Sequence, residues 1–284
     1  REQKKICTAN YERIYKMRIA ICFSGMIRTV IEAAPVIKNF IGSLYKDVDF
    51  FIHTWDISID KLWHPDSVVA KRDKKQDLML RDSNKLCEQL QESYDQKAIS
   101  VEIENYNKWY EEIGYEYLHF SPQWYSWYRS ILLKKNYEEL NNFKYDIVFR
   151  MRPDIIYPNN VKLLDEIEQF LKHPDIFYVI GYNPIKIDDV FFYSNSENMH
   201  IASSMIVETK KSPWTNNRLS EYLQSHNLEC RNAKNLWYTP LRTESLSIDP
   251  FHFNAHFNID RDCYSPYNNL RLNIDDHDRK NSIC

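Results

Sequence analysis

Two arginines and one aspartate interrupt an apolar segment in the middle of the chain. Residues 145–157 read YDIVFRMRPDIIY, so Arg150, Arg152 and Asp154 separate two aliphatic runs. If one strand continues through the segment, its alternation places all three charged side chains on one face. Guanidinium groups suit phosphate oxygens, and a lone carboxylate can hold a divalent cation that bridges a diphosphate. The alternative is an Arg–Asp ion pair that closes the sheet edge, but two arginines against one acid favour an anion site.

The elements around this segment predict an α/β fold. Apolar strands at residues 18–23 and 48–53 flank a helical pattern at residues 29–44, which is a βαβ unit. Further strands are expected at residues 99–103, 145–149, 176–180 and 190–193, with helices at residues 121–141, 161–171 and 216–224. Alternating strands and helices are typical of a mostly parallel central sheet with helices on its faces.

Ligands of such sheets bind at the carboxyl ends of the strands, where the loops converge. The polar residues directly after the first two predicted strands are therefore candidates for a binding site. They are Ser24, Gly25, Arg28 and Thr29 after the first strand, and His53, Thr54, Trp55 and Asp56 after the second. Gly25 permits a sharp turn and a helix start near Arg28 would receive phosphate, whereas the alternative is a plain tight turn.

An acidic pair precedes the last strongly apolar strand. Asp188 and Asp189 come just before the VFFY run, and a carboxylate there would serve as a general base. The alternative role of either residue is that of a loop residue or a helix cap. His252 and His256 are further candidate ligands or bases, although a packed histidine is the favoured interpretation.

Three other patterns predict structure more than chemistry. Aromatic and aliphatic residues at helical spacing favour a core stripe over a sugar-stacking surface. They are Trp124, Trp127, Tyr128, Ile131 and Leu132.

The polar residues 57–97 are expected to form a solvated helix or loop, with a lid as the minor alternative. Residues 227–284 lack a strong period and predict an irregular, packed appendage.

Composition excludes several classes of function. A formal net charge of −3 gives no overall electrostatic attraction to nucleic acid, and no run of about 18 uncharged apolar residues occurs that could span a bilayer. The P-loop, the dinucleotide glycine pattern and the G-x-S-x-G elbow are all absent. Six cysteines without C-x-x-C spacing, and no N-x-S/T acceptor, favour a reducing compartment, so a soluble cytoplasmic protein is predicted.

Four ordered motifs resemble one family of enzymes. They read MRIAICFSGMIRT from residue 17, VDFFIHTWD from residue 48, YDIVFRMRPD from residue 145 and IDDVFFYSNSENM from residue 187. In this order and spacing the chain resembles GT-A-type glycosyltransferases of bacterial surface-polysaccharide loci and of large DNA viruses such as chloroviruses and mimiviruses. The resemblance covers residues 17–200, and the last third of the chain agrees only loosely.

This resemblance implies a GT-A fold, Rossmann-like with an irregular C-terminal appendage, and a nucleoside-diphosphate sugar such as a UDP-sugar as donor. In the family, a D-x-D motif at the end of the strand near residue 145 holds Mn²⁺ or Mg²⁺ on the donor diphosphate. Here the triplet is Arg152-Pro153-Asp154, which leaves two alternatives. Either Asp154 binds the metal alone, or Arg150 and Arg152 neutralise the diphosphate directly.

The resemblance also implies roles for the other candidates. The residues implied to contact the nucleotide of the donor are Ser24, Gly25, Arg28 and Thr29. Those implied to flank the base or ribose are His53, Thr54, Trp55 and Asp56. Asp188 or Asp189 faces the acceptor, a glycan hydroxyl. Asp189 is the favoured base of an inverting displacement, with a retaining enzyme as the open alternative.

The expected organisation has three parts. An extension at residues 1–16 precedes a nucleotide-sugar-binding core at residues 17–200, and an acceptor-side region at residues 201–284 packs on that core. If the chain is viral, the expected location is the host cytoplasm. A non-catalytic nucleotide- or glycan-binding protein on the same fold is the alternative function, because the acidic motif is incomplete.

Overall fold

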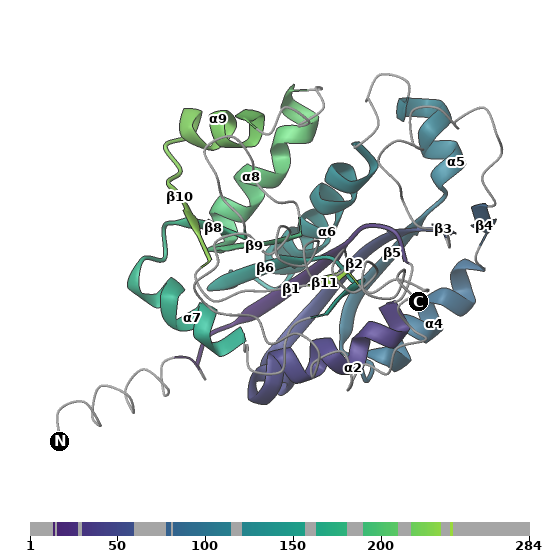
Figure 1. Cartoon of the computed structure of the whole chain (residues 1–284), viewed down its shortest axis with the longest axis horizontal. Coiled ribbons are helices and arrows are strands. Elements are labelled where there is room, and N and C mark those ends of the chain that lie inside the picture. The colour runs from purple at the N-terminus through teal and green to yellow at the C-terminus, as the bar shows by residue number, and fades with distance from the viewer. Residues whose placement is uncertain are drawn as a thin grey trace, which may run out of the picture.

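A seven-stranded sheet between two layers of helices forms the protein in the computed structural model (Figure 1). The structure describes residues 14, 16–27, 30–59, 78–80, 82–114, 121–156, 163–180, 190–209, 217–233 and 239–240. The sheet order is β10-β8-β9-β6-β1-β2-β5. Its strands are β1 (Ile19–Ser24), β2 (Val48–Trp55), β5 (Ala98–Glu104), β6 (Ile147–Met151), β8 (Phe177–Val179), β9 (Phe191–Ser194) and β10 (Cys230–Asn232).

The sheet is mostly parallel. Strands β5, β2, β1 and β6 pair in parallel, as do β10 and β8. Strand β9 runs antiparallel to both of its neighbours, β6 and β8. The predicted α/β class with a mostly parallel, Rossmann-like central sheet is therefore confirmed.

Helices cover both faces of this sheet. On one face lie α2 (Val30–Ile41), α4 (Ser83–Ser93) and α7 (Leu163–Lys172), and on the other lie α6 (Ser121–Leu140), α8 (Ser196–Thr209) and α9 (Asn217–Ser225) (Figure 1). Each helix layer packs on one face of the sheet and buries a separate apolar cluster there. Burial on both faces explains why the strands are apolar without clean alternation.

Smaller elements complete the described chain. They are a 3-10 helix (Gly42–Asp47), α5 (Tyr106–Trp109) with a π-helical turn (Tyr110–Gly114), and the short antiparallel pairs β3 (Ile57–Ile59) with β4 (Leu78–Leu80) and β7 (Ile155–Ile156) with β11 (Thr239–Pro240). Helix α4 and the β3–β4 pair lie within the stretch that the sequence predicts to be a solvated helix or loop. None of the helices in the described ranges is both long enough and apolar enough to cross a membrane.

The aromatic stripe of α6 lies in the core, as predicted. Trp124, Trp127 and Ile131 are buried beneath the sheet face that also carries Cys22 and Phe192. The Trp127 ring lies 5.0 Å from the Phe192 ring, centroid to centroid. Cys22 in β1 is fully buried, and this burial raises the pKa of its thiol to about 12.

The charged segment after β6 is not a continuous strand. β6 ends at Met151, and Pro153 and Asp154 form a turn before β7 begins. Proline has no N–H for a sheet ladder, which is why the strand stops there. The expectation that one strand places Arg150, Arg152 and Asp154 on a common face is therefore wrong.

Helix α9 and the part of α8 beyond residue 200 share the apolar core of the preceding segment. Helix α8 runs across residue 200 and packs against α6, and β10 extends the sheet beside β8. The boundaries at residues 16 and 200 stay a prediction.

A buried ionic network joins α6, α8 and the start of β6. Lys134 and Glu138 are buried one turn apart on α6, with 2.8 Å between Nζ and Oε2. The Glu138 carboxylate also accepts hydrogen bonds from the Ser196 hydroxyl (2.7 Å) and the Tyr145 N–H (2.7 Å). Because three polar groups depend on one carboxylate, its loss would leave a buried ammonium without its counter-charge.

We expect Glu138→Ala to lower the free energy of unfolding by about 3–5 kcal/mol, since breaking a buried ion pair costs that much. Glu139→Ala is the matched control, because its side chain is exposed and its pair with Lys135 spans 3.9 Å. The control should lose less than about 1 kcal/mol. Urea unfolding measures both values, and equal losses would contradict the structural role of the network.

Candidate functional site

The carboxyl ends of β1 and β6 mark the point where the strand order reverses. β1 pairs with β2 on one side and with β6 on the other, all in parallel. From β1 the chain proceeds to β2 and β5, then returns to β6 and continues to β8 and β9 on the opposite side. In open α/β sheets this reversal opens the crevice in which ligands bind. The predicted site residues at the ends of β1 and β6 flank this point.

Arg150 joins the two strands at the reversal. Its side chain is 1% exposed, and its Nε donates a hydrogen bond to the Ser24 hydroxyl at 2.8 Å. The guanidinium carbon lies 5.4 Å from the centre of the Phe192 ring on β9. A cation over an aromatic face is electrostatically favourable. The structure thus brings Ser24 and Arg150 together, as the sequence predicts, beneath covering protein.

Arg152 and Asp154 bind each other. The Nε and Nη2 atoms of Arg152 donate to the two carboxylate oxygens of Asp154 at 3.0 and 2.8 Å. Asp154 is buried, whereas the Arg152 side chain keeps 17% of its surface exposed. This bidentate contact is the Arg–Asp ion pair that the sequence allows as the alternative to an anion site. Its geometry holds Arg152 in one orientation at the end of β6.

The turn after β1 is fixed from the two neighbouring elements. Gly25 has φ = 124°, a conformation that glycine adopts without steric cost. Its N–H donates to the Ser126 hydroxyl of α6 at 2.8 Å, and its carbonyl accepts from the Thr54 hydroxyl of β2 at 2.8 Å. Gly25 and Thr54, two of the predicted donor-binding residues, are therefore in direct contact.

His53 and Trp55 are buried at the end of β2. The Nδ1 atom of His53 lies 2.9 Å from the Ser126 hydroxyl. Burial lowers the pKa of His53, and the carboxylates of Glu104 and Glu102 only partly oppose this effect. Trp55 packs against the rings of Trp109 and Tyr125 with centroids 5.0 and 5.8 Å away. These contacts place β2, α5 and α6 around one aromatic cluster.

Asp56, the last candidate after β2, accepts from α5 and its cap. Its carboxylate receives hydrogen bonds from the Asn105 amide at 2.6 Å and the Tyr106 N–H at 3.0 Å. These bonds secure the turn that follows β5. Several other candidates lie outside the described residues, and their predicted roles remain predictions. They are Arg28, Thr29, Asp188, Asp189, His252 and His256.

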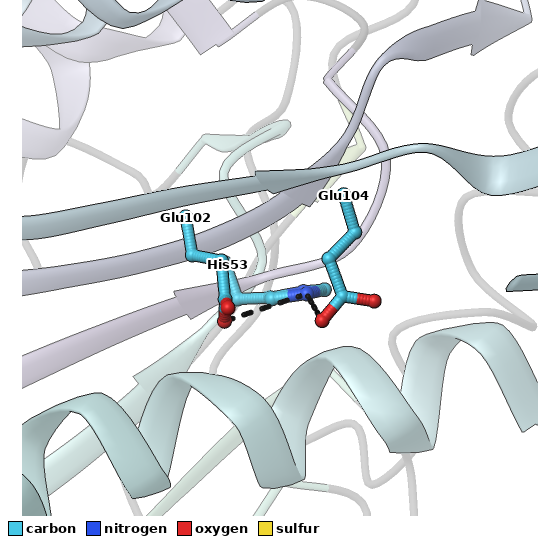
Figure 2. Close-up of side chains that lie close together, drawn as sticks. All are labelled: His53, Glu102 and Glu104. Carbon is cyan, nitrogen blue, oxygen red and sulfur yellow. Dashed lines mark ion pairs between the residues drawn. The ribbon is translucent and has the colours of Figure 1, made fainter. Parts of the chain in front are cut away.

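Sequence reasoning missed four polar residues around His53. Ser126 and Arg129 come from α6, and Glu102 and Glu104 alternate along β5 beside β2 (Figure 2). The signal for the two acids was the sequence VEIE, whose period of two puts both carboxylates on one face of a strand. Nothing in the sequence alone pairs them with His53, because that contact depends on the register between β2 and β5.

We expect Ser126→Ala to lower the free energy of unfolding by about 2–3 kcal/mol, because the Gly25 N–H and the His53 ring would both lose a buried partner. Ser130→Ala is the control, since this serine is equally buried on α6 but donates only to the Trp127 carbonyl of its own helix. It should lose less than about 1 kcal/mol. Similar losses in the two variants would show that the Ser126 contacts do not support the site.

No protein-family model and no curated protein matches this chain. Among solved structures, the chain is similar to a cytidylyltransferase from Leptospira borgpetersenii serovar Hardjo-bovis. The two share 8% sequence identity over 92% of this chain and 96% of that one, with a TM-score of 0.43. A likeness at this level does not bear on activity, and the Rossmann-like class rests on the strand order and helix layers described above.

Proposed function

We propose that the protein is a glycosyltransferase that binds a nucleoside-diphosphate sugar at the reversal between β1 and β6 and transfers the sugar to a glycan hydroxyl. The observation that carries the proposal is the Arg150 guanidinium, which sits at this reversal in contact with Ser24. Such a crevice is where α/β sheets of this type bind nucleotides. The described parts of the four motifs that resemble GT-A glycosyltransferases lie on β1, β2, β6 and β9, which are neighbours in the sheet.

The charges at the end of β6 support a role in stabilising the leaving group. A departing nucleoside diphosphate concentrates negative charge, and fixed guanidinium groups stabilise that charge as it develops. Arg152 suits this task because Asp154 already orients it and part of its side chain reaches the surface. Pre-orientation reduces the entropy lost when a phosphate binds.

The arrangement around Asp154 does not fit a divalent metal. Both carboxylate oxygens accept from Arg152, and the side chain is 2% exposed. Among the described residues, Asp154 also belongs to no group of three His, Cys, Asp or Glu side chains close enough to share a metal ion. We therefore favour direct neutralisation by Arg150 and Arg152 over a metal bound to Asp154, and no step is assigned to such a metal.

Asp189 is proposed as the general base and Asp188 as its neighbour on the acceptor side. In an inverting step, the acceptor oxygen bonds to the anomeric carbon while the bond from that carbon to the diphosphate oxygen breaks. The hydroxyl proton passes to the carboxylate, and the electron pair leaves on the diphosphate. This assignment rests on the sequence motif before β9.

The donor site can be tested by neutralising the Arg152–Asp154 pair. We expect the double variant Arg152→Gln, Asp154→Asn to bind the donor about 10- to 100-fold more weakly, since hydrogen bonds to charged groups contribute about 1.5–3 kcal/mol. Changing both residues avoids a lone buried charge. Calorimetric titration with a panel of nucleoside-diphosphate sugars, after thermal-shift screening, measures the affinity.

The control for this experiment is Glu229→Gln, Arg231→Gln. That pair has the same spacing in sequence and a 2.6 Å contact, but it lies exposed at the edge strand β10. Donor affinity should stay unchanged in the control. Unchanged affinity in the Arg152–Asp154 variant as well would remove the end of β6 from the donor site.

Asp189→Asn should reduce the rate of transfer by about 100-fold or more while donor affinity stays within about twofold, as expected for loss of a general base. Single-turnover assays with a bound donor separate the two effects. Loss of donor binding would instead assign Asp189 to the donor side. Donor binding without either transfer or donor hydrolysis in the unaltered protein would favour a nucleotide-binding protein over an enzyme.

A further inference from the structure

A second cluster of chemically active side chains lies at the ends of β2 and β5, apart from the proposed diphosphate site. It consists of His53, Glu102 and Glu104, whose ligand-type atoms all lie within 4.8 Å of one another. His53 Nε2 lies 3.4 Å from Glu104 Oε1 and 3.9 Å from Glu102 Oε2. Figure 2 shows the imidazole directed at both carboxylates, with each ion pair dashed.

The hydrogen bonds around Ser126 bear on which nitrogen of His53 carries a proton. The Ser126 oxygen accepts from the Gly25 N–H at 2.8 Å, and its single proton can go either to the His53 carbonyl at 3.0 Å or to His53 Nδ1 at 2.9 Å. When the proton goes to the carbonyl, Nδ1 carries a hydrogen and Nε2 of the neutral ring presents a lone pair. This is the tautomer that can bind a metal.

That lone pair is buried and faces two carboxylates. The His53 side chain is fully buried, and its Nε2 has no hydrogen-bond partner among the described residues. Three electron-pair donors therefore converge on one point. Such a convergence is stable only if a proton or a metal cation lies between them.

Arg129 of α6 offsets part of the negative charge and contacts the same two carboxylate oxygens that face His53. Its Nε donates to Glu102 Oε2 at 3.1 Å and lies 3.2 Å from Glu104 Oε1, and its Nη2 pairs with Glu102 Oε1. With a neutral imidazole, two carboxylates and one guanidinium leave a net charge of −1. Each carboxylate oxygen has two lone pairs, so bonding to Arg129 leaves room for a metal bond.

The spacing suits a small metal ion with nitrogen and oxygen ligands. Tetrahedral ligands at about 2.1 Å from zinc are roughly 3.4 Å apart, which is the distance between His53 Nε2 and Glu104 Oε1. Glu102 needs only a modest side-chain shift. Glu102 and Glu104 keep 26% and 22% of their side chains exposed, which provides an entry path and space for a water ligand.

The surroundings of the histidine match those of a metal ligand. Metal-binding histidines usually donate their second ring N–H to a fixed acceptor, which sets the tautomer and the ring orientation. In the tautomer with the proton on Nδ1, this N–H donates to Ser126, which the Gly25 N–H and the His53 carbonyl hold in place. This support exists in the chain itself and requires no movement of the backbone.

We propose that His53, Glu102 and Glu104 form a binding site for one divalent transition-metal ion such as Zn²⁺ or Mn²⁺, with Ser126 orienting the histidine. A mixed imidazole and carboxylate set suits these ions better than Ca²⁺ or Mg²⁺. The site does not depend on the proposed glycosyltransferase activity, because it is defined by metal binding alone.

Titration of the full chain with ZnCl₂ or MnCl₂, followed by calorimetry, tests this site. We expect one equivalent to bind, and Glu102→Gln and Glu104→Gln each to weaken that binding more than about 100-fold. Loss of a ligand should exceed the 10- to 100-fold effect typical of a supporting residue. Ser126→Ala should fall within that smaller range. Co²⁺ provides a second readout, since its visible absorption intensifies in tetrahedral coordination.

Glu139→Gln is the matched control, because this glutamate is exposed on α6 and away from the cluster. It should retain the affinity of the unaltered chain. No binding at millimolar metal would overturn the proposal and leave a proton shared between His53 and the two glutamates. Binding that survives in both glutamate variants would also overturn it and place the ion elsewhere in the chain.

Discussion

The geometry of the strand ends depends on one buried hydroxyl group, that of Ser126. It accepts from Gly25 after β1, and it bonds to both the carbonyl and the ring nitrogen Nδ1 of His53 on β2. Buried polar groups must be paired, so each of these three bonds restricts the position of the others. Through them α6 holds the turn after β1 against β2. The orientations of Gly25 and His53 follow from this contact.

The carboxyl edge of the sheet carries two clusters of opposite composition. The end of β6 has two guanidiniums and one carboxylate, and the end of β5 has two carboxylates with one guanidinium from α6. These residues are Arg150, Arg152 and Asp154 in the first cluster and Glu102, Glu104 and Arg129 in the second. Strands β1 and β2 separate them. An anionic part of a ligand would be attracted to the first cluster, and a cationic part to the second.

The sequence predicts most of the regular structure because local patterns determine it. The apolar runs of β1, β2 and β9 and the helical stripe of α6 depend on neighbours within a few residues. The contact between Ser24 and Arg150 also follows from placing polar residues at the ends of adjacent parallel strands. These features need no knowledge of long-range pairing beyond the order of the strands.

Features that depend on distant pairing were not predictable, and one local signal was missed. Pro153 ends β6 in a turn that lets Arg152 bind Asp154, although the aliphatic runs on both sides suggested one continuous strand. Helix α8 was not predicted. It is buried on several sides, so its apolar residues do not recur with a clear helical period. His53 meets Glu102 and Glu104 only through the register of two neighbouring strands.

The burial of Cys22 has a practical consequence for following the protein in solution. Its thiol lies in a central strand beneath α6, and its raised pKa keeps it protonated at neutral pH. Only the thiolate reacts with alkylating reagents. Modification of Cys22 therefore requires separation of the helix layer from β1, and its rate reports the opening of the central sheet independently of any ligand.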